Sequence, residues 1–259
     1  MDKSSFLGLI VGVGGIVAGL LLEGGRLSQV LQPTAAIIVF GGTLGAVLLQ
    51  FPTPVVTCAF RRLIRVFFEQ RRDPREMVQQ LVGFANKARR NGMISLDADL
   101  PAISDPFLKK SLMLAVDGTE PQELRKMMQL EIENQAEREE NIPRVFESAG
   151  GFAPTIGIIG AVLGLIQVMQ HLDNINEVGK GIAVAFVATV YGVGSANLFF
   201  LPSSGKLRLR IREEQIIREM TLEGVVSILE GMNPRMLETK LMGFLREQPH
   251  STKGSATWN

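Results

Sequence analysis

The sequence is short of the residues on which disulfide-stapled, metal-dependent and nucleic-acid-binding proteins depend. Its 259 residues include one Cys, one Trp, one Tyr and two His. Cys58 therefore has no disulfide partner within the chain, and His171 and His250 lie too far apart to suggest a metal site. Lysine and arginine together number 27 against 26 acids, and this near-neutral balance gives no sign of a nucleic-acid-binding surface.

Motifs for catalysis are also missing. The chain has no Gly-rich phosphate loop of the Walker type and no plausible pair of nucleophile and base. Gly12-x-Gly14-Gly15 lies inside a long hydrophobic stretch, where it cannot form a dinucleotide loop. We therefore predict that the chain is not an enzyme and has no catalytic residue, bound metal or cofactor.

Long uncharged stretches are the main feature that the sequence does have. They cover residues 4–22, 27–60, 148–170 and 181–205. About 20 helical residues cross a hydrocarbon core roughly 30 Å thick, so the pattern predicts four transmembrane helices. We place these helices at about 4–22, 33–51, 151–170 and 181–201. The first is expected to be retained, because Met1–Lys3 is a weak n-region and no Ala-x-Ala cleavage site comes after it.

The positions of Lys and Arg predict the orientation of these helices. Basic residues gather after the second and fourth spans: Arg61, Arg62, Arg65, Arg71, Arg72 and Arg75, then Lys206, Arg208, Arg210 and Arg212. The short connectors between spans 1 and 2 and between spans 3 and 4 contain only one basic residue each, Arg26 and Lys180. Because cytoplasmic segments next to spans carry the excess of Lys and Arg, both termini and the long middle segment should be cytoplasmic.

The resulting fold is an all-α integral membrane protein. Spans 1 and 2 form a hairpin, a cytoplasmic helical domain lies between spans 2 and 3, and long helices extend into the cytoplasm from spans 3 and 4. The expected divisions are a hairpin at 1–52, the cytoplasmic domain at 53–147, a second hairpin at 148–202, a helical tail at 203–247 and a disordered end at 248–259.

Start and stop signals support helices, and no sheet, in the cytoplasmic parts. Asp73-Pro74 and Asp105-Pro106 each combine an N-cap with a first-turn Pro, and Gly92 and Gly118 can end the two helices that begin there. Thr119-x-x-Gln122 has the spacing of a capping box for the helix that leads into the third span. Asn233-Pro234 starts one more short helix. Pro143 and Pro202 are expected to bend helices near the membrane boundary.

The predicted spans are rich in small residues and lack titratable acids and bases. Four-residue spacings occur at Gly8/Gly12, Gly15/Gly19, Gly41/Gly45, Gly160/Gly164 and Gly192/Ala196. Such spacings allow close helix packing, either within one chain or between subunits. No Asp, Glu, Lys, Arg or His lies inside a span, whereas a proton relay normally needs one. If the chain handles ions, a partner must supply the carboxylate.

Few polar groups remain within the last two spans. Thr189 is one of them, and Pro154 frees a backbone carbonyl nearby. A hydroxyl in a span commonly donates to the carbonyl one turn back, and an isolated Pro is commonly a kink, so neither residue indicates a site by itself.

Several motifs together resemble the MotA family of flagellar stator subunits, within the wider MotA/TolQ/ExbB superfamily. The resemblance covers about residues 4–247. It rests on the hairpin–domain–hairpin–tail order and on five segments: Lys87-Ala-Arg-Arg-Asn-Gly92, Val116-Asp-Gly-Thr-Glu120, Ala153-Pro154-Thr-Ile-Gly157, Gly160-Ala-Val-Leu-Gly164 and Ala188-Thr-Val-Tyr-Gly192. The ExbB/TolQ branch typically has one span before its large cytoplasmic segment, so the stretch at 27–60 favours the MotA branch.

The resemblance implies a mechanism and a set of partners. Five MotA-like subunits would surround two MotB-like chains in the bacterial inner membrane, and a membrane Asp of those peptidoglycan-anchored chains would accept the ion. Changes in the protonation of that Asp would turn the ring, which acts on the rotor protein FliG. Membrane lipids are the remaining expected partner, and nucleic acid is not one.

The resemblance also assigns roles to particular residues. Pro154 and Pro202 match prolines used for coupling, and Thr189 matches a hydroxyl that lines the ion path. The positions that meet the rotor protein FliG are matched by Arg89, Arg90 and Asp97, although the family often has Glu where this chain has Asp97. An ordinary solvated helix end is the alternative interpretation of the two arginines.

Ala161 bears on the identity of the ion. Sodium-driven relatives tend to have Thr at this position, because Na⁺ must exchange its water shell for several oxygens. The apolar Ala161 therefore favours protons. Two functions remain as alternatives to a proton-driven torque subunit: an ExbB/TolQ-type energiser of outer-membrane processes, and a passive membrane scaffold.

Overall fold

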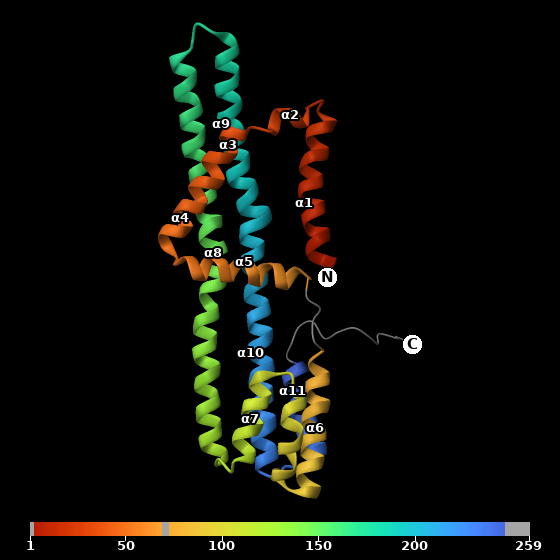
Figure 1. Cartoon of the computed structure of the whole chain (residues 1–259). Coiled ribbons are helices and arrows are strands. Elements are labelled where there is room, and N and C mark those ends of the chain that lie inside the picture. Colours follow the sequence, from red (N-terminus) through yellow and green to blue (C-terminus); the bar gives the residue numbers. More distant parts are fainter. Residues whose placement is uncertain (1–2, 69–72, 247–259) are drawn as a thin grey trace, which may run out of the picture. The chain divides into compact units, whose positions relative to one another are not determined.

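The computed structural model describes residues 3–68 and 73–246, and every element within these ranges is helical. The expected disordered end at 248–259 lies outside the described residues. The chain forms two compact units. Unit 1 comprises Met1–Gln70 and Arg138–Arg210, and unit 2 comprises Arg71–Glu137 and Ile211–Asn259. Two helices, α8 (Pro121–Gln170) and α10 (Leu201–Leu229), contribute residues to both units (Figure 1).

Unit 1 contains the apolar helices. Besides its parts of α8 and α10, its elements are α1 (Lys3–Leu22), α2 (Leu27–Val30), α3 (Pro33–Ala36), η1 (Ile37–Gly41), α4 (Gly42–Gln50), α5 (Thr53–Phe68), α9 (Ile175–Ser195) and η3 (Ala196–Phe200). Among the described residues, three helical segments are long and apolar enough to cross a membrane: Pro33–Gln50, Pro121–Gln170 and Ile175–Leu229. Phe6–Leu22 is a shorter apolar stretch.

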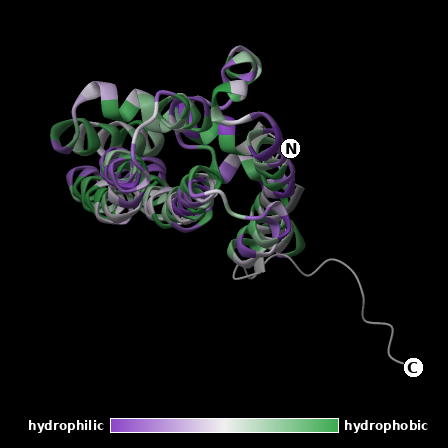
Figure 2. Cartoon of the chain, turned by 90° about the horizontal axis from the view of Figure 1, so that it is seen from below, coloured by the Kyte–Doolittle hydropathy of each residue, from purple (hydrophilic) through white to green (hydrophobic). Residues whose placement is uncertain are grey.

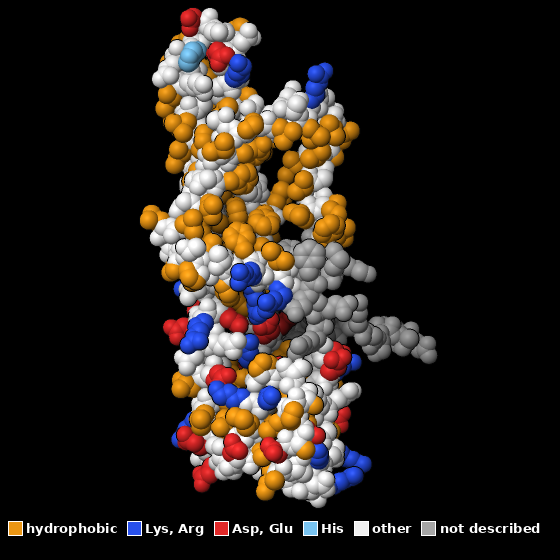
Figure 3. Space-filling view, in the orientation of Figure 1, with side chains coloured by type: hydrophobic (Ala, Val, Ile, Leu, Met, Phe, Trp, Pro, Cys, Tyr) orange, Lys and Arg blue, Asp and Glu red, His pale blue; other side chains and the backbone are white. Residues whose placement is uncertain are grey.

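The surface of unit 1 matches this composition. Large apolar side chains such as Leu49 and Phe186 are 91% and 71% exposed. Figure 3 shows hydrophobic side chains over much of the visible face of these helices, and a group of Lys and Arg side chains at the edge of the hydrophobic region. Exposed apolar area on this scale is typical of a surface that contacts lipid or other subunits.

Two short segments of unit 1 have the wider turns of a π-helix. At the end of η3, the backbone N–H of Leu201 donates to the carbonyl of Ala196, five residues back. Pro202 comes directly after it and has no N–H, and its ring would clash with the carbonyl four residues back in a regular α-helix. A wider turn at this point relieves that clash. Residues Ile37–Gly41 form the other π segment, η1, in the middle of the Pro33–Gln50 stretch.

Unit 2 is built from short amphipathic helices. Its further elements are α6 (Pro74–Asn91), the 3₁₀ segment η2 (Met93–Ala102), α7 (Pro106–Val116) and α11 (Pro234–Arg246). Asp73 caps α6 by accepting from the backbone N–H of Arg75 at 2.9 Å, and Asp105 caps α7 by accepting from Phe107 and Leu108 at 3.0 Å. Figure 2, a view from below, shows hydrophobic and hydrophilic residues intermixed along the helices.

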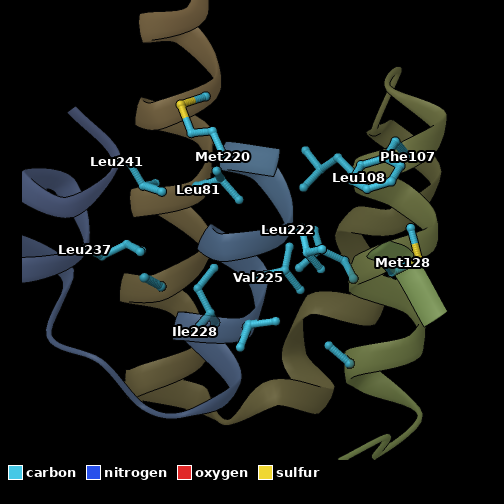
Figure 4. Packing of buried hydrophobic residues seen from close by; sticks show 14 of the residues in the cluster. Leu81, Phe107, Leu108, Met128, Met220, Leu222, Val225, Ile228, Leu237 and Leu241 are labelled. Carbon is cyan, nitrogen blue, oxygen red and sulfur yellow. The ribbon is translucent and has the colours of Figure 1, made fainter. Parts of the chain in front are cut away.

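The core of unit 2 lies where these helices meet. Leu81 of α6, Leu237 and Leu241 of α11 and Met220 of α10 are fully buried, and α7 adds Leu108. Figure 4 shows these side chains pointing toward one another from the separate helices. Burial of a Leu or Met side chain contributes about 1.5–3 kcal/mol, so this cluster is the main source of stability for unit 2.

The predicted capping box at Thr119 is wrong. Helix α8 begins at Pro121, and the N–H of Thr119 donates to the carbonyl of Leu114 at 3.1 Å. The N–H of Gly118, whose φ is +85°, donates to the carbonyl of Ala115 at 3.3 Å. This pair of bonds is a Schellman motif, so Thr119 belongs to the end of α7 and not to the start of α8.

Candidate functional site

Helices α8 and α9 of unit 1 approach each other through their glycines. A Cβ atom at Gly157 would lie 2.9 Å from the carbonyl oxygen of Ala188, and one at Gly164 would lie 2.7 Å from that of Gly181. Real Cβ atoms do not come this close to backbone atoms, so only glycine permits this separation of the two helices. Close backbone approach of this kind is how helices associate in a bilayer.

Pro154 lies at one end of this glycine contact. A Cβ at Gly192 of α9 would be 2.6 Å from the carbonyl oxygen of Ala153 and 3.2 Å from the Cα of Pro154. Pro154 lacks an N–H, so the carbonyl four residues earlier, at Gly150, loses its usual helical donor. The helix nevertheless continues through Pro154 without interruption. The pattern therefore places a proline-weakened turn of α8 directly against the backbone of α9.

Pro202 is positioned by the same part of α8. A Cβ at Gly150 would lie 2.7 Å from the Cγ of Leu201, the residue just before Pro202. Pro202 itself is exposed, at the start of α10 and directly after the π segment. On α8, Gly150 adjoins the residue before Pro202, and Pro154 follows Gly150 by about one helical turn. The two predicted coupling prolines are therefore linked through the same short part of α8.

Thr189 is exposed on α9, and its neighbours in sequence include the packed Ala188. Its Oγ1 donates to the carbonyl of Ala185 at 3.2 Å, which is the local bond expected for a hydroxyl in a span. The hydroxyl oxygen keeps its lone pairs, so it can still accept a hydrogen bond from a water or a protonated group. Geometry therefore leaves Thr189 able to interact with a group outside the chain.

Ala161 lies half-buried on α8, between the packed Gly160 and Gly164. Residues 148–170 and 181–205 contain no Asp, Glu, Lys, Arg or His. Two of their hydroxyls are engaged locally: Thr155 Oγ1 donates to the carbonyl of Phe152 at 2.8 Å, and Ser195 Oγ donates to that of Gly192 at 3.2 Å. These two stretches offer hydroxyls and backbone carbonyls but no acidic or basic side chain.

Tyr191 ties α9 to the segment that precedes Pro33. Its phenol donates to the carbonyl of Val30 at 2.6 Å and accepts from the backbone N–H of Gln32 at 3.4 Å. Its ring stacks on Phe40, with centroids 5.9 Å apart. Tyr191 therefore fixes the start of the Pro33–Gln50 stretch two residues away from Thr189.

The residues predicted to meet the rotor lie on unit 2. Arg89 and Arg90 are exposed in the last turn of α6, and Asp97 is exposed in the next element, η2. With the residues that the structure describes, none of the three side chains forms a hydrogen bond or an ion pair. Lys87, in contrast, binds Asp99 at 2.7 Å. Two cations in the last turn also suit the helix dipole, so their position alone fits either interpretation.

A three-residue network holds α10, α11 and α8 together within unit 2. Arg125 donates to Glu223 at 2.7 Å, and Lys240 also donates to Glu223. These bonds lower the pKa of the Glu223 carboxyl below its ordinary value, and the bond from Arg125 has the largest effect. Partial burial acts in the opposite direction. The same carboxylate raises the pKa of Arg125.

The search for four-residue spacings missed two glycines of the α8–α9 contact, Gly157 and Gly181. It did include Gly160, Gly164 and Gly192, which also approach a neighbouring helix closely, whereas Gly8, Gly15, Gly19, Gly41 and Gly45 have no neighbouring atom within 4 Å of a Cβ position. The i, i+3, i+7 series Gly157, Gly160 and Gly164 was the available signal. It marks one face of α8, which a search for four-residue spacings alone does not separate from the rest.

The comparisons with known proteins agree with this architecture. Residues 99–220 match the MotA/TolQ/ExbB proton channel family, and residues 6–92 match the N-terminal family of motility protein A. Motility protein A of Bacillus subtilis is 36% identical over 247 residues, which cover 95% of this chain and 91% of that protein. The chemotaxis protein PomA of Vibrio alginolyticus is 30% identical over 95% of this chain and 96% of that protein.

Solved structures are similar over almost the whole chain. A chain of C. jejuni MotAB has a TM-score of 0.90 at 32% identity and covers 98% of this chain and 100% of its own length. A chain of the flagellar MotAB stator complex from Bacillus subtilis has a TM-score of 0.86 at 36% identity. The match covers 94% of this chain and 96% of that chain. The fold and the comparisons therefore define an all-helical membrane protein of the proton channel class. The chain belongs to the MotA/TolQ/ExbB proton channel family.

Proposed function

We propose that the chain is the MotA-type subunit of a flagellar stator in the bacterial inner membrane. It assembles with itself and with a MotB-like partner into a complex that conducts protons and generates torque on the rotor protein FliG. The observation that carries this proposal is the pairing of a tightly packed, acid-free α8–α9 contact with an exposed hydroxyl at Thr189. A surface formed by α8 and α9 that has a hydroxyl but no acid suits an ion-accepting carboxylate that another chain supplies.

The proposed topology has four spans with both termini in the cytoplasm. Three stretches meet the length and hydropathy of a span, and Phe6–Leu22 adds a fourth, shorter one. The excess of Lys and Arg after Gln50 and after Phe200 supports a cytoplasmic location for the segments that these residues begin. Unit 2 then lies in the cytoplasm, where a rotor protein is accessible.

Thr189 and Ala161 belong to the proposed ion path. The membrane Asp of the partner accepts a proton, and the Thr189 oxygen is available to hydrogen-bond it or a water that accompanies it. Ala161 offers no oxygen at the position where sodium-driven relatives tend to have Thr, which favours a proton as the translocated ion. The available driving energy is about 2.3 kcal/mol per elementary charge per 100 mV.

Coupling runs through Pro154 and Pro202. Protonation changes how the Asp-bearing helix of the partner fits against α8 and α9. A Cβ atom at Gly192 of α9 would lie 3.2 Å from the Cα of Pro154, and one at Gly150 of α8 would lie 2.7 Å from the Cγ of Leu201, the residue before Pro202. A shift of α9 therefore reaches both proline-weakened turns. Five copies of the chain around two partner chains would convert that shift into rotation.

Contact with FliG is assigned to Arg89, Arg90 and Asp97. Their side chains are exposed and free of ion pairs with described residues, so binding a charged rotor surface does not first require an internal pair to break. Charges at the rim of an interface mainly set the rate and register of docking. This arrangement supports a transient contact, as repeated stepping along a rotor requires.

The test is co-expression with the MotB-like partner in a non-motile strain that lacks both subunits. Restored swimming that stops when the proton gradient is collapsed, and that is lost when the partner's membrane Asp is changed to Asn, would support a proton-driven torque subunit. Membrane complexes that form without restoring swimming would indicate a passive scaffold, and restored swimming that persists without the proton gradient would contradict a proton-driven subunit. Rescue of outer-membrane import instead of swimming would identify an ExbB/TolQ-type energiser.

A further inference from the structure

An apolar hollow of about 460 Å³ lies within unit 1, between η1, α4, α5, α8, the end of α9 and η3. Aromatic side chains form much of its wall, among them Phe40, Phe60, Phe146 and Phe199. The rings of Phe60 and Phe146 pack edge to face with centroids 5.3 Å apart. The volume falls in the usual range of roughly 300–1,000 Å³ for sites that bind small molecules.

The few polar side chains in the wall already have partners. Thr43 Oγ1 donates to the carbonyl of Val39 at 2.6 Å, and Ser195 Oγ donates to that of Gly192 at 3.2 Å. A water needs two to four polar partners to be stable in a cavity. The wall offers almost none, so the hollow suits hydrocarbon.

Helix α5 places positive charge beside this wall. Its buried face is Val56, Ala59, Leu63 and Val66, and its apolar outer face carries Phe60 and Ile64, which are 41% and 58% exposed. Figure 1 shows α5 running crosswise to the unit 1 part of α8. An amphipathic helix with this distribution is typical of one that lies in the plane of a membrane interface.

The arginines of α5 differ in their contacts. Arg62 reaches Glu139 at 3.8 Å. Arg61 and Arg65 lie one turn apart, are exposed, and make no ion pair or hydrogen bond with the residues that the structure describes. Like charges four residues apart on a helix repel each other, so an anion bound between them would be favourable. Guanidinium groups bind phosphate oxygens with two hydrogen bonds.

We propose that unit 1 binds one anionic phospholipid, with an acyl chain in the hollow and the phosphodiester at Arg61 and Arg65. The inference rests on the proposed embedding in the membrane. Phe60 lines the hollow and directly precedes Arg61, so a single molecule with an apolar end and an anionic end can satisfy both features. A second copy of the chain would have to supply an apolar group and a carboxylate at the same place.

The experiment uses the complex with its MotB-like partner, reconstituted in bilayer discs. The probe is phosphatidylglycerol with a photoreactive group in one acyl chain, and labelled peptides are mapped by mass spectrometry. We expect label on peptides that contain Phe60, Phe146 or Phe199. At about 1 kcal/mol per Arg near an anionic surface, R61Q/R65Q should weaken the probe's affinity roughly 30-fold. R89Q/R90Q removes the same charge from unit 2 and should leave the labelling unchanged.

Three results would overturn the lipid site. They are equal labelling by a phosphatidylcholine probe, unchanged labelling in R61Q/R65Q, and a chain-to-chain adduct when a photoreactive amino acid replaces Phe60. The last would show that a second copy occupies the hollow. Absence of the wild-type chain from the membrane fraction would instead contradict the proposed embedding, so the two failures are distinguishable.

Discussion

The phenol of Tyr191 donates a hydrogen bond to the backbone carbonyl of Val30, 2.6 Å away and 161 positions earlier in the sequence. This bond joins α9 to the segment that leads into Pro33–Gln50, and the Tyr191 ring adds a stacking contact with Phe40. The hydroxyl and the ring can be removed separately, which allows their contributions to be compared.

Tyr191→Phe should lower the stability of the purified complex by about 1 kcal/mol, because the Val30 carbonyl loses a partly buried donor while the stacked ring remains. Tyr191→Ala should lower it further, because the ring is lost as well. The thermal unfolding midpoint in detergent measures both variants. A midpoint for Tyr191→Phe equal to that of the wild type would show that the hydrogen bond does not hold the two segments together.

Gly192→Ala should separate α8 from α9. The new methyl group would meet the carbonyl of Ala153 at 2.6 Å, and overpacking of this kind costs about 1–3 kcal/mol. Gly194→Ala on the same helix is the matched control, since no atom lies within 4 Å of its Cβ position. The yield of assembled complex and its thermal stability are the measurements. Equal behaviour of the two variants would contradict the close contact.

Thr189→Val should reduce proton-driven swimming while complexes still form at the wild-type level. The change keeps the shape of the side chain but removes the exposed hydroxyl. Thr57→Val is the control, because Thr57 is also exposed and also donates to a nearby carbonyl, that of Pro54 at 3.0 Å. Swimming speed and proton flux into vesicles test the prediction. Normal flux in Thr189→Val would remove this residue from the ion path.

Arg90→Glu combined with Asp97→Lys should impair swimming without reducing the amount of membrane complex. Both side chains are exposed and unpaired with described residues, so their reversal does not disturb the core of unit 2. Arg235→Glu, exposed on α11, is the control for a charge reversal elsewhere on the unit. Fewer complexes in the double variant would assign Arg90 and Asp97 to folding or assembly.

Glu223→Gln should loosen the packing of α11, and the effect should depend on pH. The folded-state pKa of Glu223 is lowered, so its charged form stabilises unit 2 above the unfolded pKa of about 4.3, and this contribution is lost as the pH falls through the folded value. Hydrogen exchange of α11 amides, compared between variant and wild type at each pH, measures it. Glu238→Gln is the control on α11. A difference that stays constant down to acid pH would contradict the assignment.

Sequence signals predict the local limits of the helices better than their packing. Asp73, Asp105 and Gly92 lie where capping chemistry places them, because a cap depends on residues within one turn. The Schellman motif at Thr119 is easily mistaken for the start of the next helix, since both interpretations use the same polar residue after Gly118. The π segments were not predicted, because a helix can accommodate a proline such as Pro202 either by a bend or by a wider turn, and the sequence does not distinguish the two.

The candidate site was predictable as a set of residues but not as an arrangement. The Ala188–Gly192 and Ala153–Gly157 motifs both pointed to the region, and the family resemblance supplied roles for Pro154 and Thr189. The contact of Gly192 with Pro154 depends on how two helices lie against each other, and periodicity within one helix does not contain that information. The hollow beside α5 was missed for the same reason, because its wall comes from six separate elements.

The backbone contact between Gly192 and Pro154 has a mechanical consequence. Where long side chains separate two helices, they can yield by changing rotamers when one helix moves. Here the main chains of Gly192 and Pro154 approach each other directly. No side chain between them can change its rotamer when α9 moves near Thr189. Under the proposed coupling, a displacement of α9 would therefore move the proline turn of α8 with it.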